Sequence, residues 1–167
     1  MMNSCISNQD CICRRYQNRT KGCINEFSIE DSGKKIQLTK RAEDDVLAII
    51  LDGCLMTDNN TKCDALFLFQ NLNKKISFLI ELKGFGDIEK AFMQLEYTKN
   101  HRLEYKQIID CFKSLDNKKV KEHFIIVTNG ILDKIQKEKY EEQYRIRVKA
   151  VLNNDATKKI PNLRDYI

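Results

Sequence analysis

The sequence predicts an α/β fold with a mixed central sheet flanked by helices, and its core elements follow the order α-β-β-α-β. Residues 66–69 and 78–80 are apolar on both alternating faces, which indicates neighbouring strands covered on both sides. Stretches with helical apolar periodicity precede and follow this pair. A third apolar run, at residues 123–128, is typical of a central strand.

The length and composition indicate one domain with a substantial core. In a chain of 167 residues we expect a cysteine-rich basic arm over residues 1–25 and a single domain over residues 26–167. The net charge of +5 suits a nucleic-acid partner without requiring one. No signal peptide is visible, and the longest apolar run is too short to cross a bilayer. We therefore expect a soluble cytoplasmic protein without a membrane partner.

Four of the seven cysteines lie among basic residues near the N-terminus: Cys5, Cys11, Cys13 and Cys23. An odd cysteine count without a secretory signal predicts free thiols or metal ligands rather than a disulfide framework. Four thiolates can hold Zn²⁺, but this spacing is not one of the common paired patterns. We favour the alternative, a reduced and poorly ordered arm that contacts phosphates.

The next two segments are predicted to be a hairpin and a helix. Residues 26–38 hold two short alternating runs about an Asp-Ser-Gly turn, which is typical of a hairpin. Residues 39–51 are predicted to form a helix with Thr39 as its N-cap. On that helix Glu43 shares the apolar face and points inward. It is either a site residue, with Asp44 as the second choice, or an acid near a positive helix end.

The two phenylalanine-containing strands bring charged residues together. If they fold back antiparallel about residues 72–73, opposed residue numbers sum to 145, and Asp64 faces Glu81. Lys83 lies two residues beyond Glu81 and therefore emerges on the same face. Like charges placed opposite each other are destabilising, and buried charges are tolerated when they are paired or bind a metal. A divalent cation accounts for both carboxylates at once.

Asp64 at the start of one strand and Glu81-x-Lys83 at the end of the next resemble the PD-(D/E)xK nuclease superfamily, which has the restriction-endonuclease-like fold. The resemblance covers residues 41–128, and Cys63 replaces the proline that often precedes the aspartate. It implies that Asp64, Glu81 and the carbonyl of Leu82 bind Mg²⁺ or Mn²⁺, that Lys83 activates or orients water, and that Glu43 completes the metal site. The implied reaction is hydrolysis of a phosphodiester bond.

The segment after Lys83 predicts a substrate-contacting helix. Two glycines at residues 84 and 86 let the backbone approach a ligand closely. On the helix from residue 88, Lys90, Gln94 and Tyr97 form one stripe. This stripe resembles the glutamine–tyrosine helix motif of several branches of the superfamily, which implies substrate contact. An ordinary amphipathic helix boundary offers the same trio, and that alternative stays open.

Two more helices and two more strands are predicted in the remaining sequence: helices at residues 100–115 and 131–144, and strands at residues 123–128 and 145–152. The last strand has one basic face, which either follows a phosphate backbone or protects a sheet edge from aggregation. We favour protection. His101 and His123 are interpreted as structural.

The function that follows is a Mg²⁺-dependent endonuclease acting on nucleic acid, with DNA preferred. No recognition domain is evident, so a homodimer or a larger nuclease complex is expected to supply specificity. Two alternatives remain: an inactive nuclease-fold subunit for nucleic-acid binding or assembly, and a thiol or zinc regulatory protein centred on the N-terminal cysteines.

Overall fold

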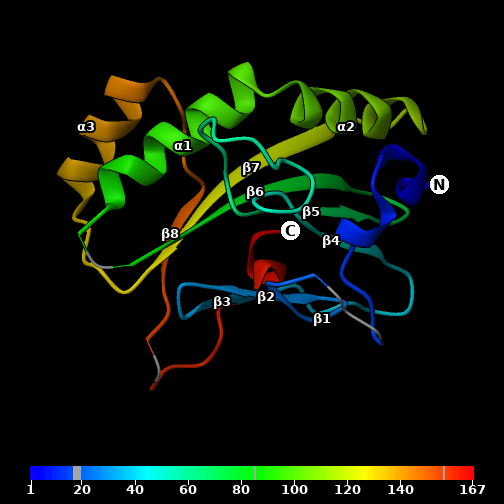
Figure 1. Ribbon diagram of the computed structural model, residues 1–167, viewed down its shortest axis with the longest axis horizontal. Coiled ribbons are helices and arrows are strands. Elements are labelled where there is room, and N and C mark those ends of the chain that lie inside the picture. The colour runs from blue at the N-terminus through cyan, green and yellow to red at the C-terminus, as the bar shows by residue number, and fades with distance from the viewer. Residues whose placement is uncertain (17–19, 85, 156) are drawn as a thin grey trace.

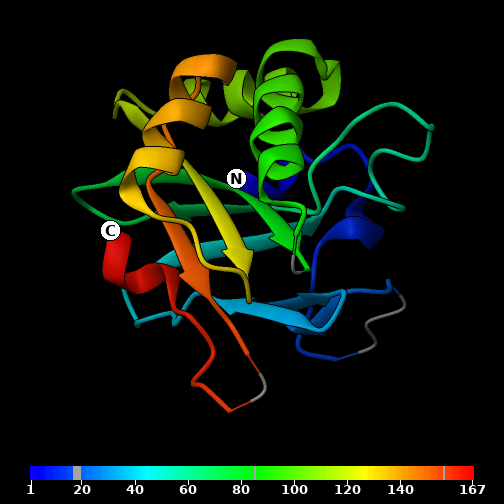
Figure 2. The ribbon, with the colours of Figure 1, turned by 90° about the vertical axis from the view of Figure 1, so that its left-hand side faces the viewer.

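The computed structural model describes residues 1–16, 20–84, 86–155 and 157–167. Over these residues it has a five-stranded mixed sheet, a three-stranded antiparallel sheet and three α-helices. The helices cover one face of the larger sheet, and the smaller sheet covers the other face (Figures 1 and 2). The predicted α/β class with a mixed central sheet is confirmed, although helices lie on one of its faces only.

The larger sheet has the order β4-β5-β6-β7-β8. Its strands are β4 (Asp45–Ile50), β5 (Ala65–Gln70), β6 (Lys75–Lys83), β7 (Val120–Thr128) and β8 (Ala150–Asn153). The first three strands form an antiparallel meander, and β7 and β8 then add in parallel. The parallel pairs need crossovers, which the helices supply. They are α1 (Ile88–His101) and α2 (Leu103–Ser114) between β6 and β7, and α3 (Lys134–Tyr144) between β7 and β8.

The register predicted for the central hairpin is confirmed. Leu66 pairs with Leu79 and Gln70 with Lys75, so opposed numbers sum to 145. The alternation of side chains along these strands builds two apolar cores. Leu66 and Leu79 pack with residues of α1 and α2, whereas Phe67 and Phe78 pack with residues of the smaller sheet. Both strands are therefore covered on both faces, as the sequence indicated.

The predicted helix over residues 39–51 is wrong, because residues 45–50 form strand β4. This strand pairs antiparallel with β5 along its whole length. The run from Val46 to Leu51 is apolar throughout, so it satisfies a helical period and a strand period equally. Its β-branched valine and isoleucines favour the strand. Both faces of β4 are covered: Ile49 lies in the core beneath the helices, and Ala48 lies in the core between the sheets.

The smaller sheet contains β1 (Cys23–Asn25), β2 (Ser28–Asp31) and β3 (Lys34–Gln37). The pairing of β2 with β3 confirms the predicted hairpin. At its turn, Ser32 and Gly33 both have positive φ, which glycine adopts readily. Short 3₁₀ helices lie near the two ends of the chain: η1 (Met2–Cys5), η2 (Gln9–Cys11) and η3 (Leu163–Tyr166).

The C-terminal strand was predicted too long. Strand β8 begins at Ala150, five residues later than expected. Arg145 instead ends α3 in the left-handed conformation, and Ile146 and Val148 are buried in the connection. The alternation of apolar and polar residues along residues 145–152 therefore reflects burial of the connection as well as the short strand β8.

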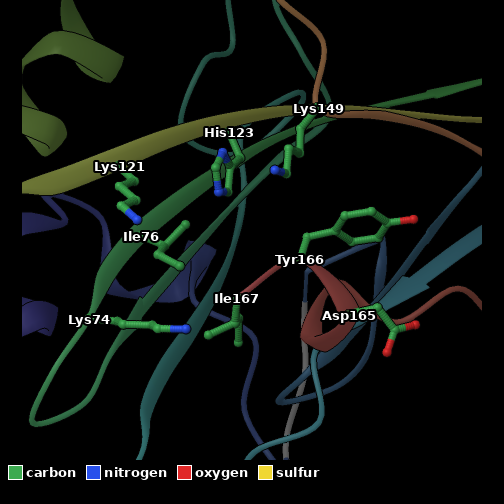
Figure 3. A pocket seen from close by; sticks show the side chains of 8 residues that line it. All are labelled: Lys74, Ile76, Lys121, His123, Lys149, Asp165, Tyr166 and Ile167. Atoms are coloured by element: carbon green, nitrogen blue, oxygen red, sulfur yellow. The ribbon is translucent and has the colours of Figure 1, made fainter.

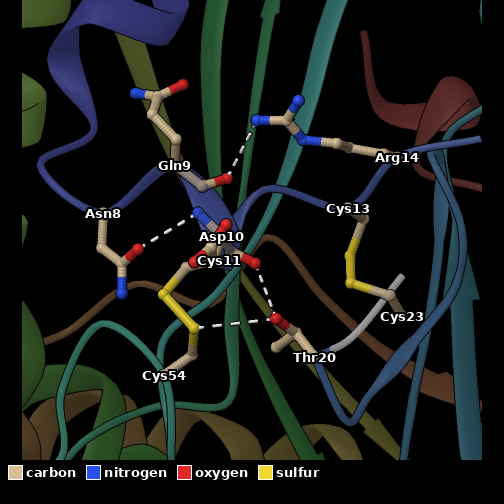
Figure 4. Close-up of a disulfide and its surroundings, with 9 residues drawn as sticks. All are labelled: Asn8, Gln9, Asp10, Cys11, Cys13, Arg14, Thr20, Cys23 and Cys54. Carbon is tan, nitrogen blue, oxygen red and sulfur yellow. Dashed lines mark hydrogen bonds between the residues drawn. A yellow bond between two sulfur atoms is a disulfide. The ribbon is translucent and has the colours of Figure 1, made fainter. Parts of the chain in front are cut away.

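The expectation of free thiols near the N-terminus is also wrong. Three disulfides join Cys5 to Cys111, Cys11 to Cys54 and Cys13 to Cys23. Figure 4 shows the last two bonds close together beside Thr20. Because each sulfur is bonded to another cysteine, the four N-terminal cysteines do not form a zinc site in this structure. The segment also packs on the domain, since Met2, Ile6 and Ile12 are buried in the core beneath the helices.

Membrane-crossing helices are not found in the described part of the chain: each helix there is too short or too polar to span a bilayer.

Candidate active site

Three of the predicted site residues meet where β5 begins and β6 ends. The ladder ends at the pair of Ala65 with Ile80, where the backbone N–H of Asp64 donates to the carbonyl of Ile80 at 3.2 Å. Asp64 lies near enough to Glu81 to affect the pKa of Glu81. Because Leu79 faces the helices, Glu81 and Lys83 emerge on that same face of β6. The ammonium Nζ of Lys83 lies 2.9 Å from Oε1 of Glu81. The backbone N–H of Leu82 donates to Oδ2 of Asp64 at 2.6 Å. The structure thus brings together two carboxylates and one lysine.

The carboxylate of Glu81 is fully buried, with 0% of its side chain exposed. Among the described groups, neither of its oxygens has a hydrogen-bond partner. The ammonium of Lys83 forms an ion pair with Oε1, and the thiol of Cys63 lies beside the same carboxyl group, so both offset part of the cost of burial. A buried charge left without hydrogen bonds is costly. Glu81 is therefore the strongest sign that the site binds something besides its own side chains.

The electrostatics of the pair follow from burial. Burial, and then the charge of Asp64, raise the pKa of Glu81 well above its ordinary value. Burial also raises the pKa of Asp64 to about 7, against the opposing hydrogen bond from Leu82. Burial opposes the charged form of Lys83, but the two carboxylates raise its pKa above the ordinary value. The charge of Asp64 therefore disfavours ionisation of Glu81, and Lys83 opposes this effect.

The donor set fits a divalent cation of the hard, oxygen-loving type. Mg²⁺ is commonly held by one or two carboxylates and keeps several waters. Asp64 and Glu81 supply those carboxylates, although Oε1 of Glu81 is already paired with Lys83. In the described residues, no group of three or more His, Cys, Asp or Glu side chains is placed to hold a metal. The carbonyl of Leu82 remains the predicted third protein ligand.

Glu43 does not join this group. It is exposed in a turn before β4 because the helix on which it was predicted does not exist. Strand β4 starts at Asp45, opposite Gln70, and reaches the Asp64 end only at Ile50. Five residue steps along a strand separate the two ends by roughly 16 Å. Glu43 therefore lies at the other end of the sheet.

Asp44, the second choice, has a structural role at that distant end. It is buried, forms an ion pair with Arg164 and accepts a hydrogen bond from the backbone N–H of Arg41 at 2.9 Å. Burial opposes the charged form, but the bonds from Arg41 and Arg164 lower the pKa of this carboxyl overall. Asp44 thus ties the C-terminal segment to the start of β4.

Of the three predicted substrate-binding residues on α1, Gln94 is the one hydrogen-bonded to the segment that carries Asp64. Its Nε2 donates to the carbonyl of Lys62 at 2.8 Å, and its buried Oε1 has no partner among the described groups. Lys90 is exposed, and the ring of Tyr97 lies 4.9 Å from the ring of His101. Contact of these three residues with substrate stays a prediction.

Sequence reasoning missed the groups that surround the acids. The buried thiol of Cys63 has a raised pKa, first because of burial and then because of the nearby Glu81 carboxylate. The backbone N–H of Cys63 donates to the buried Oγ1 of Thr98 at 2.9 Å, which fixes α1 to the strand that follows. Asp31 and Asp52 lie near enough to raise the pKa of Asp64. Tertiary packing brings Asp31 and Asp52 near Asp64, and no local sequence pattern indicates that they lie near it.

No protein-family model, curated protein or solved structure matches the chain. The case for any activity therefore depends on the residues and strand order described above.

Proposed function

We propose that the chain is a Mg²⁺-dependent phosphodiester hydrolase, an endonuclease whose substrate is DNA. The observation that carries the proposal is Glu81, a buried carboxylate that accepts no hydrogen bond from the described groups and lies beside a partly buried acid and a lysine. We also propose membership of the PD-(D/E)xK nuclease superfamily. An antiparallel meander followed by helices and a parallel strand supports that assignment, with one acid directly before the second strand and the other on the third.

Asp64, Glu81 and the carbonyl of Leu82 would hold the metal, Mg²⁺ or Mn²⁺. When bound, such an ion polarises a phosphoryl oxygen and lowers the pKa of a water molecule. Lys83 is the group of this chain that would orient the attacking water and stabilise negative charge developing on the phosphate. Its ammonium already lies at the acids, 2.9 Å from Glu81. Since both acids have raised pKa values, metal binding would release protons at neutral pH.

One observation favours the alternative, an inactive nuclease-fold subunit that binds nucleic acid or serves in assembly. Lys83 already pairs with Glu81, and Leu82 already donates to Asp64. In that case the acids and the lysine are a structural cluster. A binding subunit would hold DNA equally well with and without Mg²⁺ and would never cut it.

The disulfides bear on where the enzyme works. Three disulfide bonds are typical of oxidising compartments and are rare in the reducing cytoplasm. We therefore favour an oxidising compartment over the cytoplasm that the sequence led us to expect. A homodimer or a larger complex, which would allow both strands of DNA to be cut, stays a prediction.

The decisive experiment compares wild type with Asp64→Asn, Glu81→Gln and Lys83→Met on plasmid DNA, single-stranded DNA and RNA. We expect Mg²⁺-dependent cleavage by wild type and a loss of about 100-fold or more in each variant, as for removal of one charge-stabilising group. Glu43→Gln is the matched control, because it removes the same charge at the far end of the sheet and should leave cleavage unchanged.

Equal cleavage by wild type and all three site variants would show contaminating activity and end the proposal. DNA binding that ignores Mg²⁺, without cleavage under any condition, would select the inactive-subunit alternative. Calorimetry with Mn²⁺ gives an independent readout, because Asp64→Asn and Glu81→Gln should weaken metal binding whatever the substrate.

A further inference from the structure

A polar pocket lies at the end of the central strands opposite the candidate active site. Its volume is about 540 Å³, and eight residues line it: Lys74, Ile76, Lys121, His123, Lys149, Asp165, Tyr166 and Ile167 (Figure 3). They come from the turn before β6 and its start, the start of β7, the connection before β8, and η3 with the residue that follows it. The volume falls within the range of roughly 300–1,000 Å³ that is typical of small-molecule sites.

The charge of this pocket is positive on balance, because three lysines and one aspartate line it. Figure 3 shows the side chains of Lys74, Lys121 and Lys149 reaching toward the space between His123 and Ile167, whereas the carboxylate of Asp165 turns away from them. Among the described residues, no carboxylate lies within 4.0 Å of any of these three ammonium groups. Three like charges around one cavity repel each other unless an anion joins them.

The pKa of the half-buried His123 is lowered by burial and by two of the same lysines. Burial, then Lys149 and then Lys121 lower the pKa of its imidazole, so at neutral pH it is an uncharged donor or acceptor rather than a fourth cation. Its ring packs against Phe78 with 5.5 Å between centroids. The pocket therefore combines three ammonium groups with a fixed, neutral aromatic ring and apolar wall from Ile76.

This pocket is separate from the candidate active site. Ile125 and Val127 pack between the two sheets, so Lys121 and His123, which alternate with the same phase along β7, lie on that face. Glu81 and Lys83 lie on the face toward the helices and at the other end of β6. The central sheet itself stands between the two sites.

We propose that this pocket binds a small molecule carrying two or more phosphate groups, with a nucleoside diphosphate as its representative ligand. The three lysines contact the phosphates, since ammonium groups bind phosphate as point charges without strict geometry. His123 and Tyr166 border the space left for the base. Convergence of the lysines on one cavity favours a compact ligand, because a nucleic-acid backbone needs cations spread along a track.

Isothermal titration calorimetry on the full chain tests this, in metal-free buffer without phosphate, with ADP, inorganic pyrophosphate and adenosine as probes. We expect ADP and pyrophosphate to bind and adenosine not to bind. In the double variant Lys121→Gln/Lys149→Gln, affinity should fall roughly tenfold or more for each lysine removed. Both lysines are exposed, so the variant should fold, and a thermal melt checks it.

The matched control is Lys106→Gln/Lys139→Gln, which removes the same charge from exposed positions on α2 and α3. It should change ADP affinity less than twofold, which separates a built pocket from general attraction. The proposal is overturned if wild type binds neither ADP nor pyrophosphate, or if the two double variants lose affinity equally. It is also overturned if binding of a DNA oligonucleotide depends on Lys121 and Lys149 while binding of ADP does not.

Discussion

In the folded protein, burial makes ionisation of both Glu81 and Asp64 unfavourable. A proton or a cation offsets this penalty, so the stability of the metal-free protein must depend on pH. Asp64 gives the clearer case, because burial raises its pKa from 3.8 to about 7.

The sign of this dependence follows from proton binding. Between about pH 4 and pH 7 the folded protein binds more protons at Asp64 than the unfolded chain, so the stability that Asp64 contributes is present below about pH 4 and falls as pH rises to about 7. Asp64→Asn removes the penalty and keeps an oxygen that can accept from Leu82. We expect it to be more stable than wild type at pH 8 by about 1–3 kcal/mol.

Urea unfolding of the metal-free proteins at pH 8 and pH 4.5 measures this difference. The two proteins should converge at the lower pH, and added Mg²⁺ should stabilise wild type but not Asp64→Asn. A variant less stable than wild type at pH 8 would contradict the account of a buried, disfavoured carboxylate.

Part of the candidate site was predictable because it depends on one local hairpin. The turn at residues 71–74 sets the register, and the register then places Asp64 beside Glu81 and Lys83. Asp31 is near enough to affect the pKa of Asp64 only because the smaller sheet packs on the larger one, which no spacing in the sequence reveals. Glu43 was misplaced because its position depended on a helix that is a strand.

At the scale of elements, the C-terminal end of α3 is unusual, because the left-handed residue that ends a helix is most often glycine. Arg145 has φ of 51°, a left-handed conformation that glycine adopts with less strain. The backbone N–H of Ile146 donates to the carbonyl of Glu141 at 3.1 Å, and Ile146 is buried, as in a Schellman cap. The cap forms although arginine is unfavourable in the left-handed conformation that Arg145 adopts.

Arg145→Gly should therefore stabilise the protein by about 0.5–1 kcal/mol, because relief of the left-handed strain exceeds the added chain entropy of glycine. Differential scanning calorimetry should show a rise in Tm of roughly 1–3 °C. Arg147→Gly, the same change two residues on and outside the positive-φ region, should lower Tm. If both variants lower Tm, the strain at Arg145 is not significant.

Elements with a single dominant period were predictable, and so were the apolar runs at residues 66–69 and 123–128, whereas the apolar run at residues 46–51 was assigned to the wrong element. The helices at α1 and α2 alternate apolar and polar residues clearly enough to be located within a few residues. Residues 46–51 are apolar at every position, so only pairing with β5 decides that they form a strand. Apolar and basic residues do alternate along residues 145–152. In the first half of this stretch, however, the apolar residues Ile146 and Val148 are buried in a loop and not in a strand.

At the scale of the whole molecule, disulfides join distant parts of the chain. Cys5 and Cys111 are 106 residues apart and tie η1 to α2, whereas Cys13 and Cys23 are 10 residues apart. Which cysteines pair depends on the folded arrangement, which is why the sequence could not reveal the bonds. In the chain-entropy model a longer closed loop restricts the unfolded state more.

Cys5→Ser/Cys111→Ser should therefore cost more stability than Cys13→Ser/Cys23→Ser. The model gives about 4.7 kcal/mol for a 100-residue loop and about 3 kcal/mol for a 15-residue loop. Guanidinium unfolding without reductant measures the difference, and an excess of dithiothreitol should make both variants and wild type nearly equal. Equal losses in the two variants under oxidising conditions would contradict the loop-length argument.

The bond between Cys5 and Cys111 has one more consequence, for the fate of the protein after a protease acts on it. Residues 57–60 are an exposed loop between these two cysteines, a few residues before Asp64 and strand β5. A single cut there would leave both pieces fastened by sulfur, so the clipped molecule would migrate at its full mass on a gel until a reducing agent released the fragments. Backbone scission and physical separation are thus distinct events for this chain, and redox conditions decide whether the second follows the first.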